Sequence, residues 1–396
     1  MKKNILIVAA NENSRKAERI RHRGQYNIHY FDLHYSSRNN IFDFDILGYL
    51  DKAREYIKNH KIDGIFYHLD IGTLIGAKLC EEFNLPGPSF ESVFLVYNKY
   101  YTRVKTDHAI AFDFLDLSCS KKNCFSFPFY LKAPCSSLGV LGYKISNEQV
   151  FNENIVIAKK QLPNMINAIF PLFEKYVDLQ TYPLATKPIM MVEELIKGFQ
   201  ITVEGFVYNN EVFFTVITDT NLFSDLKRID NFSLPTVLSE QVQEKIKAVA
   251  VKDVRAVGLN NTFFNCEYWI GDDAIILIEI NGRAASAFYN LYKQVYNYDV
   301  IEAGIQLCLG QKPNIELKQN GFGAQCNIVT IKEGNSSNMV HYDKLPKSCS
   351  LFIPPNNNVM QFGECGRVIA QVELFGQTYA ETKNKADAIR KRVMKV

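Results

Sequence analysis

Short apolar runs alternate with amphipathic stretches over the N-terminal part of the chain. Asn4–Ala10 and residues 63–69 are continuous hydrophobic runs of strand length, whereas 14–23, 47–60 and 72–83 have the pattern of helices with a polar face. Strands that alternate with helices along a chain form parallel sheets covered by helices. The pattern therefore predicts a small α/β domain at the N-terminus.

The hydrophobic pattern changes after residues 85–89, whose sequence Leu-Pro-Gly-Pro-Ser breaks regular structure and indicates a domain boundary. Residues 152–176 form either one helix containing Pro171 or two shorter helices. The other expected elements are strands at 127–133, 189–195, 200–207, 211–218, 263–269 and 274–280, a helix at 239–257, and short strands from 321 onward that end in a helix at 380–396. We therefore expect a multidomain chain of α/β and α+β type.

Composition narrows the class of protein. Of the 396 residues, 47% are hydrophobic and 22% are charged, which allows a large buried core and excludes a disordered chain or a small disulfide scaffold. The 45 Lys and Arg residues against 42 Asp and Glu leave a formal net charge of +3. This excess is too small to make nucleic acid the expected partner.

Cysteine usage and the lack of targeting signals in the sequence point to the cytoplasm. The nine cysteines are irregularly spaced, and the closest pair, Cys119 and Cys124, has no second pair or histidine cluster at zinc-finger spacing. We expect reduced thiols. The first apolar run ends at Ala10, too early for a signal peptide, and no segment has the ~20 apolar residues that a membrane helix needs. The expectation is a soluble, cytoplasmic protein with no membrane partner.

Two glutamates and an asparagine stand out on the last predicted hairpin. Glu279 and Asn281 are two residues apart on one strand and therefore share a face. If a three-residue loop pairs Gly271 with Ile275, the register places Glu267 opposite Glu279. Opposed carboxylates repel each other unless a cation lies between them or one is protonated. Two carboxylates and an amide oxygen are hard ligands that favour Mg²⁺.

The alternative is that both glutamates are surface residues at strand ends and that Asn281-Gly282 is a hairpin turn. A loop one residue shorter or longer would also destroy the alignment. Arg283 favours the metal site, because a guanidinium beside a metal ion is suited to hold a transferring phosphoryl group or an oxyanion.

Lys132 lies near the end of a predicted strand and is followed by a loop of small residues that contains Ser136, Ser137 and Gly139. A cation beside exposed backbone N–H groups has the outline of a phosphate site. The loop matches neither the Walker A sequence nor GxGxxG. The alternative is a structural lysine whose ammonium group reaches water.

Residues 191–198 form a strand that ends in a kink. Such a crossing can offer an adenine ring a backbone donor and a backbone acceptor between apolar side chains. The alternative is an ordinary strand that ends in a solvated Glu193-Glu194 pair.

Taken in order, these segments resemble the ATP-grasp superfamily, and within it the carboxylate-amine ligases such as the L-amino acid ligases. The resemblance rests on Lys132 with its loop, on 193–196, 198–205 and 279–283, and on Glu267, and it spans nearly the whole chain. It implies an N-terminal α/β domain at 1–90, linker helices and a mobile lid at 91–196, a central subdomain with the metal site at 197–310, and a strand-rich C-terminal segment at 311–396 that completes the core.

The resemblance also implies a role for individual residues. Lys99 and Lys132 would contact the phosphates of ATP, and Ser136, Ser137 and Gly139 would form the mobile loop over them. Glu193 would meet the adenine amino group, with Glu194, Leu195 and Ile196 in the same hinge. Gln200 would contact the ribose, at a position where these ligases commonly have Glu. Glu267, Glu279 and Asn281 would hold Mg²⁺, with Mn²⁺ as an alternative, and Arg283 would stabilise an acyl phosphate.

The implied activity is an ATP-dependent ligation of small molecules, in which a carboxylate is phosphorylated and an amine then displaces phosphate to form an amide or peptide bond. One alternative keeps the fold but uses a purine-pathway amine or bicarbonate, and another is a nucleotide-binding regulator without turnover. The oligomeric state is left open by the sequence, with a homodimer as one alternative.

Two further groups of residues have alternative interpretations. His68 and Asp70 follow a predicted parallel strand, where they could line the acceptor pocket, although a core histidine is the alternative for His68. The basic cluster on 14–23 is either a solvated helix face or part of an anion site; its members are Arg15, Lys16, Arg19, Arg21 and Arg23.

Overall fold

The computed structural model of the chain describes residues 2–10, 24–32, 44–107, 110–119, 125–136, 139–224, 228–271, 274–361 and 366–395. The helix expected at 14–23, with its basic cluster, lies outside these residues, as do Ser137 and the loop positions 272–273.

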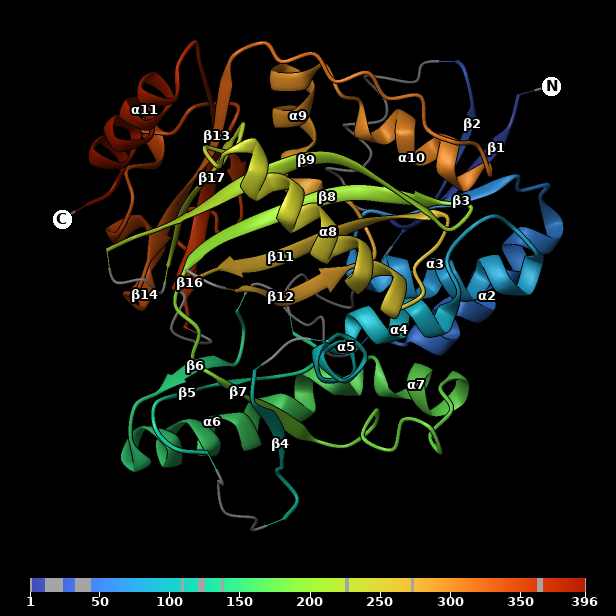
Figure 1. Ribbon diagram of the computed structural model, residues 1–396, viewed down its shortest axis with the longest axis horizontal. Coiled ribbons are helices and arrows are strands. Elements are labelled where there is room, and N and C mark those ends of the chain that lie inside the picture. Colours follow the sequence, from blue (N-terminus) through green and yellow to red (C-terminus); the bar gives the residue numbers. More distant parts are fainter. Residues whose placement is uncertain are drawn as a thin grey trace.

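The N-terminal domain contains a three-stranded parallel sheet, as predicted (Figure 1). Its strands lie in the order β2-β1-β3 and span Asn4–Ala10 (β1), Asn27–Asp32 (β2) and Gly64–Phe66 (β3). The helices α2 (Ile46–Asn59) and α3 (Asp70–Phe83) match the predicted helical ranges within two residues at either end. The strand β3 is shorter than the expected range 63–69. Its C-terminal end leads directly into α3.

An eight-stranded sheet forms the centre of the molecule, in the order β12-β11-β8-β9-β10-β13-β17-β15 (Figure 1). Its strands span Phe199–Tyr208 (β8), Glu211–Leu222 (β9), Ile229–Leu234 (β10), Thr262–Ile270 (β11), Ile275–Asn281 (β12), Phe322–Thr330 (β13), Ser350–Leu351 (β15) and Arg367–Gly376 (β17). The two predicted hairpins are confirmed as the antiparallel pairs β8/β9 and β11/β12.

Helices cover both faces of this central sheet. One face carries α8 (Glu240–Ala256), whose apolar side packs with inward residues of β8 and β11, and α11 (Tyr379–Val393), which lies against β13 and β17. The other face meets α9 (Tyr289–Tyr296), and α10 (Val300–Cys308) packs between β11 and β3. A separate two-stranded antiparallel sheet consists of β14 (Gly334–Asn335) and β16 (Asn358–Val359).

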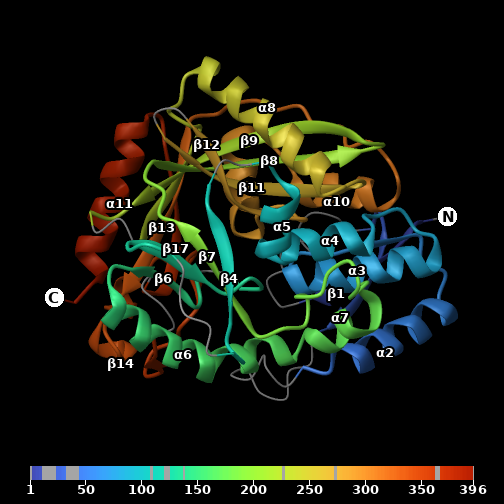
Figure 2. The same cartoon turned by 60° about the horizontal axis from the view of Figure 1, so that its bottom comes forward.

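A four-stranded antiparallel sheet, which we call the lid, lies below the central sheet (Figures 1 and 2). It has the order β4-β7-β5-β6, with strands Phe112–Asp116 (β4), Phe129–Lys132 (β5), Gly142–Ile145 (β6) and Ile189–Glu194 (β7). The helices α4 (Phe90–Tyr97) and α5 (Lys99–Lys105) connect the N-terminal domain to it.

The predicted helical stretch at 152–176 consists of two helices, α6 (Glu148–Asn167) and α7 (Phe170–Tyr176), so the two-helix alternative is the right one. Pro171 lies in the first turn of α7, where its missing N–H would have no intrahelical partner in any case. A proline inside a single long helix would instead remove a backbone hydrogen bond. The break before Pro171 avoids this loss, whereas α6 contains Pro163 in its interior.

The C-terminal strands β13, β15 and β17 join the same sheet as the predicted metal-site hairpin. The four domain ranges stay a prediction, because a shared sheet does not set their boundaries. In the parts of the chain that the structure covers, no helix is both long and apolar enough to span a bilayer.

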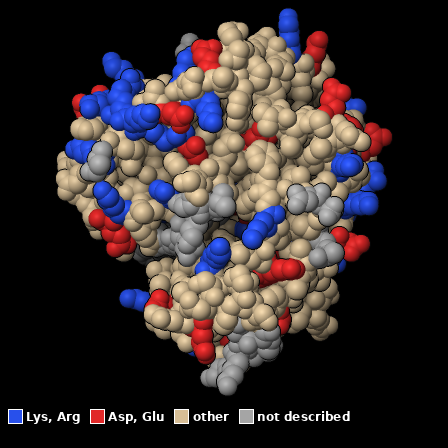
Figure 3. Space-filling view, turned by 60° about the vertical axis from the view of Figure 1, so that its left-hand side comes forward, with Lys and Arg blue, Asp and Glu red and all other residues tan. Residues whose placement is uncertain are grey.

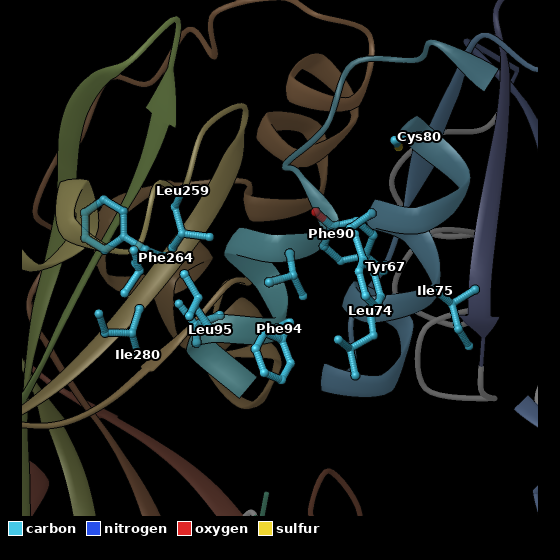
Figure 4. Close-up of a cluster of buried hydrophobic side chains, with 14 of the residues drawn as sticks. Tyr67, Leu74, Ile75, Cys80, Phe90, Phe94, Leu95, Leu259, Phe264 and Ile280 are labelled. Atoms are coloured by element: carbon cyan, nitrogen blue, oxygen red, sulfur yellow. The ribbon is translucent and has the colours of Figure 1, made fainter. Parts of the chain in front are cut away.

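One hydrophobic core continues from the N-terminal domain into the central sheet. Figure 4 shows Leu74 of α3, Phe94 of α4 and Phe264 of β11 within one buried cluster. Phe94 is fully buried and meets Phe173 edge-on at a centroid distance of 5.1 Å. The N-terminal domain is thus packed tightly against the hairpin that carries the glutamates.

We expect Phe94→Ala to lower the free energy of unfolding by about 3–5 kcal/mol, because it removes a fully buried ring and leaves a cavity at the junction of the two domains. Urea unfolding of the ligand-free protein measures this change. The matched control is Phe352→Ala, whose ring is 55% exposed and whose loss should change stability by no more than about 0.5 kcal/mol. Equal effects of the two substitutions would contradict the shared core.

Candidate active site

Glu267 and Glu279 lie directly opposite each other on β11 and β12, as predicted, but by a different route. The three-residue loop with Gly271 paired to Ile275 is wrong. The Gly271 N–H donates to the Ala274 carbonyl at 2.9 Å, and Ile275 pairs with Ile270. This shorter turn shifts the register by one residue, and a bulge after Glu267 shifts it back. The bulge therefore decides that the two carboxylates meet.

The two carboxylates are surrounded by donors on the same face of the sheet. Lys99 Nζ lies 2.9 Å from Glu279 Oε2, and Gln200 Nε2 donates to Glu267 Oε2 at 3.0 Å. The Asn281 side chain is next to Glu279, with Nδ2 at 3.5 Å from Oε1. All four predicted residues of this group are thus in one place, together with the lysine that the sequence assigned to phosphate.

The pKa values of the two glutamates move in opposite directions. Burial, and then the charge of Glu279, raises the pKa of Glu267 to about 8. Burial also acts to raise the pKa of Glu279, but the charge and hydrogen bond of Lys99 outweigh it and lower that pKa below its ordinary value. The pair therefore holds one proton near neutral pH when no other cation is present. A site with this shortage of positive charge is suited to a divalent cation.

The donor set fits a hard metal ion. Two carboxylates and the Asn281 amide oxygen can supply three oxygen ligands, and Mg²⁺ commonly binds through one or two carboxylates with phosphate and water in the other positions. Among the described residues, no group of three or more His, Cys, Asp and Glu side chains forms an alternative metal site.

A second buried charge cluster lies beside the first, where the lid meets the central sheet. The Glu193 carboxylate of β7 pairs with Lys132 of β5 through one oxygen and with Arg103 Nη2 through the other, at 2.9 Å. All three side chains are at most 8% exposed. Burial lowers the pKa of Lys132 despite the Glu193 charge. Arg103 Nη2 also donates to the Leu277 carbonyl of β12 at 2.5 Å, which links this cluster to the β11/β12 hairpin.

Arg103 was not identified from the sequence. A signal was present, because Lys99 and Arg103 are four residues apart and therefore lie on one face of α5. What the spacing could not show is that this face points at Glu193. The Arg103 Nη1 nitrogen is buried and has no hydrogen-bond partner among the residues that the structure describes.

The predicted adenine hinge lies at the end of β7. Both oxygens of Glu193 are engaged by cations, so an adenine contact of this residue stays a prediction. The Glu194 N–H donates to the Ala111 carbonyl at 2.9 Å, and the Glu194 side chain is exposed. Leu195 and Ile196 are half-buried in the segment between β7 and β8.

The loop after β5 is tied to Lys99. The Ser136 carbonyl accepts from Lys99 Nζ, and the Ser136 hydroxyl donates to the Ala133 carbonyl at 3.0 Å. Gly139 has a φ of 69°, a left-handed conformation that glycine adopts without strain. The loop therefore places backbone groups beside the first lysine, while its action on a nucleotide stays a prediction.

A chain of hydrogen-bonded polar side chains extends from Asn281 into the core. Asn281 Nδ2 donates to Asn265 Oδ1 at 3.1 Å, and Asn265 Nδ2 donates to Glu204 Oε1 at 2.7 Å. Burial raises the pKa of Glu204 to about 7. The sequence signal was the polar alternation of Gln200, Thr202 and Glu204 on β8, which places all three on the face of the glutamate pair.

Arg283 follows β12 directly and pairs with Asp70 at the start of α3. His68 is 4% exposed, and its Nδ1 lies 3.3 Å from the Tyr289 hydroxyl. The core alternative therefore describes His68. The candidate active site thus combines side chains from the N-terminal domain, the linker helix, the lid and the central sheet. Figure 3 shows an indentation where the lid, at the bottom, meets the rest of the molecule, with basic side chains at its border.

Part of the chain matches a known domain family. Residues 126–289, which include most of the lid and the β11/β12 hairpin, match the family model of the ATP-grasp domain. This segment of the chain is therefore similar to ATP-grasp domains. No curated protein sequence matches it significantly.

Solved structures of several enzymes share the fold over at least 99% of this chain. An L-amino acid ligase from Bacillus licheniformis has a TM-score of 0.79 at 15% identity, with 100% of this chain and 98% of that chain covered. A phosphoribosylglycinamide synthetase from Anaerococcus prevotii has a TM-score of 0.65 at 19% identity, with both chains fully covered. A carboxyaminoimidazole ribonucleotide synthase from Aspergillus clavatus has a TM-score of 0.66 at 13% identity, with 99% of each chain covered. At these identities the likeness establishes the fold.

The raised pKa of Glu267 predicts how the stability of the folded protein changes with pH. Because this pKa is raised from 4.5 to about 8 in the folded state, the folded protein binds the extra proton, and Glu267 contributes stability at low pH that is lost as pH rises towards 8. Glu267→Gln should remove this contribution. In metal-free buffer, the unfolding free energy of the wild type minus that of the variant should therefore decrease from pH 5 to pH 8.

The control is Glu244→Gln, which changes an exposed glutamate on α8 and should follow the wild-type pH dependence throughout. Parallel curves for the wild type and Glu267→Gln would contradict the raised pKa of Glu267.

Proposed function

We propose that this protein is an ATP-grasp enzyme, an ATP-dependent carboxylate-amine ligase that forms an amide or peptide bond between small molecules through an acyl phosphate. The observation that supports it is the opposed pair Glu267 and Glu279, which lies against Lys99 and has Asn281 on the same face. This group holds too little positive charge by itself, and a nucleotide with its metal ion would complete it.

The cations of the site suit the phosphates of ATP. Lys99 and Lys132 come from the linker helix and the lid, and Arg103 adds Nη1, a buried donor that has no partner in the described part of the chain. Glu267, Glu279 and Asn281 would hold Mg²⁺, which when bound neutralises the charge that develops on transferred phosphate.

Phosphoryl transfer to a carboxylate needs stabilisation of negative charge and exclusion of water. We assign the first task to Arg283, whose planar guanidinium can bind two oxygens of the acyl phosphate. We assign the second to the lid, since an acyl phosphate that meets water hydrolyses before an amine attacks it. The amine then displaces phosphate, and the products are an amide, ADP and inorganic phosphate.

The L-amino acid ligase from Bacillus licheniformis supports an amino acid or similar molecule as substrate, because it has the highest TM-score among the neighbours described above. The purine-type alternative is supported by the two synthetases at TM-scores of 0.65 and 0.66. Both alternatives use the same nucleotide site, so the substrate screen decides between them.

The test is a screen of amino acids, small carboxylates and amines in pairs, with MgATP, for release of phosphate, followed by mass spectrometry of the product. ATP consumption that depends on one carboxylate and one amine, with the mass of their amide, supports the ligase. Consumption with bicarbonate or a ribonucleotide amine instead would support the purine-type enzyme. Tight ATP binding without ADP release under any pair would favour a regulator.

We expect Glu279→Ala to reduce Mg²⁺-dependent turnover by about 10²-fold or more with the fold retained, because it removes one metal ligand and the partner of Lys99. Phosphate release at saturating MgATP measures the effect, and circular dichroism checks the fold. Glu244→Ala, an exposed change on α8, should keep wild-type turnover. Normal turnover of Glu279→Ala would remove this residue from the metal site.

A further inference from the structure

We propose that Asp70, in the N-terminal domain, is the positioning residue for Arg283: it holds the guanidinium at the place of phosphoryl transfer and away from the metal-binding carboxylates. This inference rests on the proposed function for the role of Arg283. The position of the guanidinium itself can be tested without any substrate.

The ion pair has the geometry of a fork. Arg283 Nε lies 2.5 Å from Asp70 Oδ1, and Nη2 lies 3.0 Å from Oδ2, so both carboxylate oxygens are engaged. The two side chains are 17% and 28% exposed, and a paired arrangement of this kind fixes the plane of the guanidinium. Arg283 Nη1 is 3.3 Å from the Ala284 carbonyl. An arginine has five N–H groups, so donors remain on the side away from Asp70.

Asp70 is held in place by its own helix. It is the first residue of α3, a 14-residue helix, and a carboxylate is stabilised in the first helical turn. The helix is packed into the core through Leu74 and Ile75, which belong to the same buried cluster as Phe94 (Figure 4). The carboxylate is therefore presented from a rigid element.

The turn that carries Arg283 is anchored separately by the same domain. The Tyr67 hydroxyl lies 2.9 Å from Thr262 Oγ1, which in turn donates to the Gly282 carbonyl at 3.0 Å. A Cβ atom at Gly282 would lie 3.5 Å from the Thr73 side chain, an ordinary packing distance. Because the backbone is held by these contacts, the ion pair with Asp70 is left to set the direction of the side chain.

Without Asp70, other carboxylates would attract the guanidinium. The charge of Arg283 acts on Glu267, and that of Glu279 acts on Arg283, so the acidic pair lies within electrostatic range. An arginine that turned to this pair would occupy the metal ligands and leave the acyl phosphate without its partner. Asp70 thus has two effects. It orients the Arg283 guanidinium, and it leaves the carboxylates of Glu267 and Glu279 available for a metal ion.

The first experiment follows the Arg283 Nε–H by nitrogen-15 NMR of arginine-labelled, ligand-free protein, with Arg283→Lys used to assign the signal. In the wild type, the Nε–H group donates to Asp70 Oδ1, so its proton should exchange slowly with water. In Asp70→Ala the exchange should be at least about tenfold faster, or the signal should move. An unchanged signal would overturn the proposal, and this result does not depend on which substrates the protein uses.

The second experiment uses the substrate pair found by the screen. Asp70→Ala should reduce kcat by about 10- to 100-fold with KM for ATP within about threefold, because a displaced group slows the chemical step more than nucleotide binding. Combined with Arg283→Lys, it should cause little further loss, since both changes act through one guanidinium. An equal loss in both backgrounds, or no loss in kcat, would overturn the role of Asp70.

The matched control is on the same helix. Glu82 of α3 also holds an arginine through both oxygens, with Arg54 Nε and Nη2 at 2.6 and 2.8 Å, away from the site. Glu82→Ala should keep kcat within twofold of the wild type. A loss as large as that of Asp70→Ala would show that any broken ion pair on α3 disturbs turnover and would overturn the specific role.

Discussion

The repulsion between Glu267 and Glu279 is the constraint around which this site is built. They are opposed on adjacent strands of a partly buried sheet, where one of them keeps a proton unless more positive charge arrives. Two opposed carboxylates do not stabilise a buried sheet, since apolar residues or a pair of opposite charges would be more stable at these positions. Here a bulge in β11/β12 is needed to place the two carboxylates opposite each other, so the strand register itself produces their repulsion. A metal ion bound with a polyphosphate would supply the positive charge that relieves this repulsion.

Positive charge comes to this pair from three separate parts of the chain. Lys99 and Arg103 lie on one face of a short linker helix, Lys132 ends a strand of the lid, and Arg283 follows the glutamate hairpin. Each is paired with a carboxylate in the ligand-free structure. The cations are therefore ordered before a nucleotide binds, and exchange of partners rather than folding of loops would accompany binding. Pre-ordered charges of this kind stabilise a transition state without reorganisation.

The N-terminal domain is part of this arrangement. Its core is continuous with that of the central sheet, and its helix α3 reaches the turn beside the glutamates. Such contacts explain why a small parallel domain, whose own strands carry no member of the glutamate pair, is joined so closely to the nucleotide-binding region. Its Asp70 carboxylate pairs with Arg283, which follows the glutamate hairpin.

Local pattern in the sequence determined most elements and several site residues. The apolar runs and helical spacing predicted β1, α2, α3, α8 and both hairpins, and the alternation along a strand placed Glu279 and Asn281 on one face. The tertiary structure decided what depends on distant partners: the bulge that restores the register after a shorter turn, the meeting of Arg103 with Glu193, and the pairing of Arg283 with Asp70, 213 residues away. Spacing reports only on neighbours within one element, whereas these contacts arise where separately folded elements pack against each other.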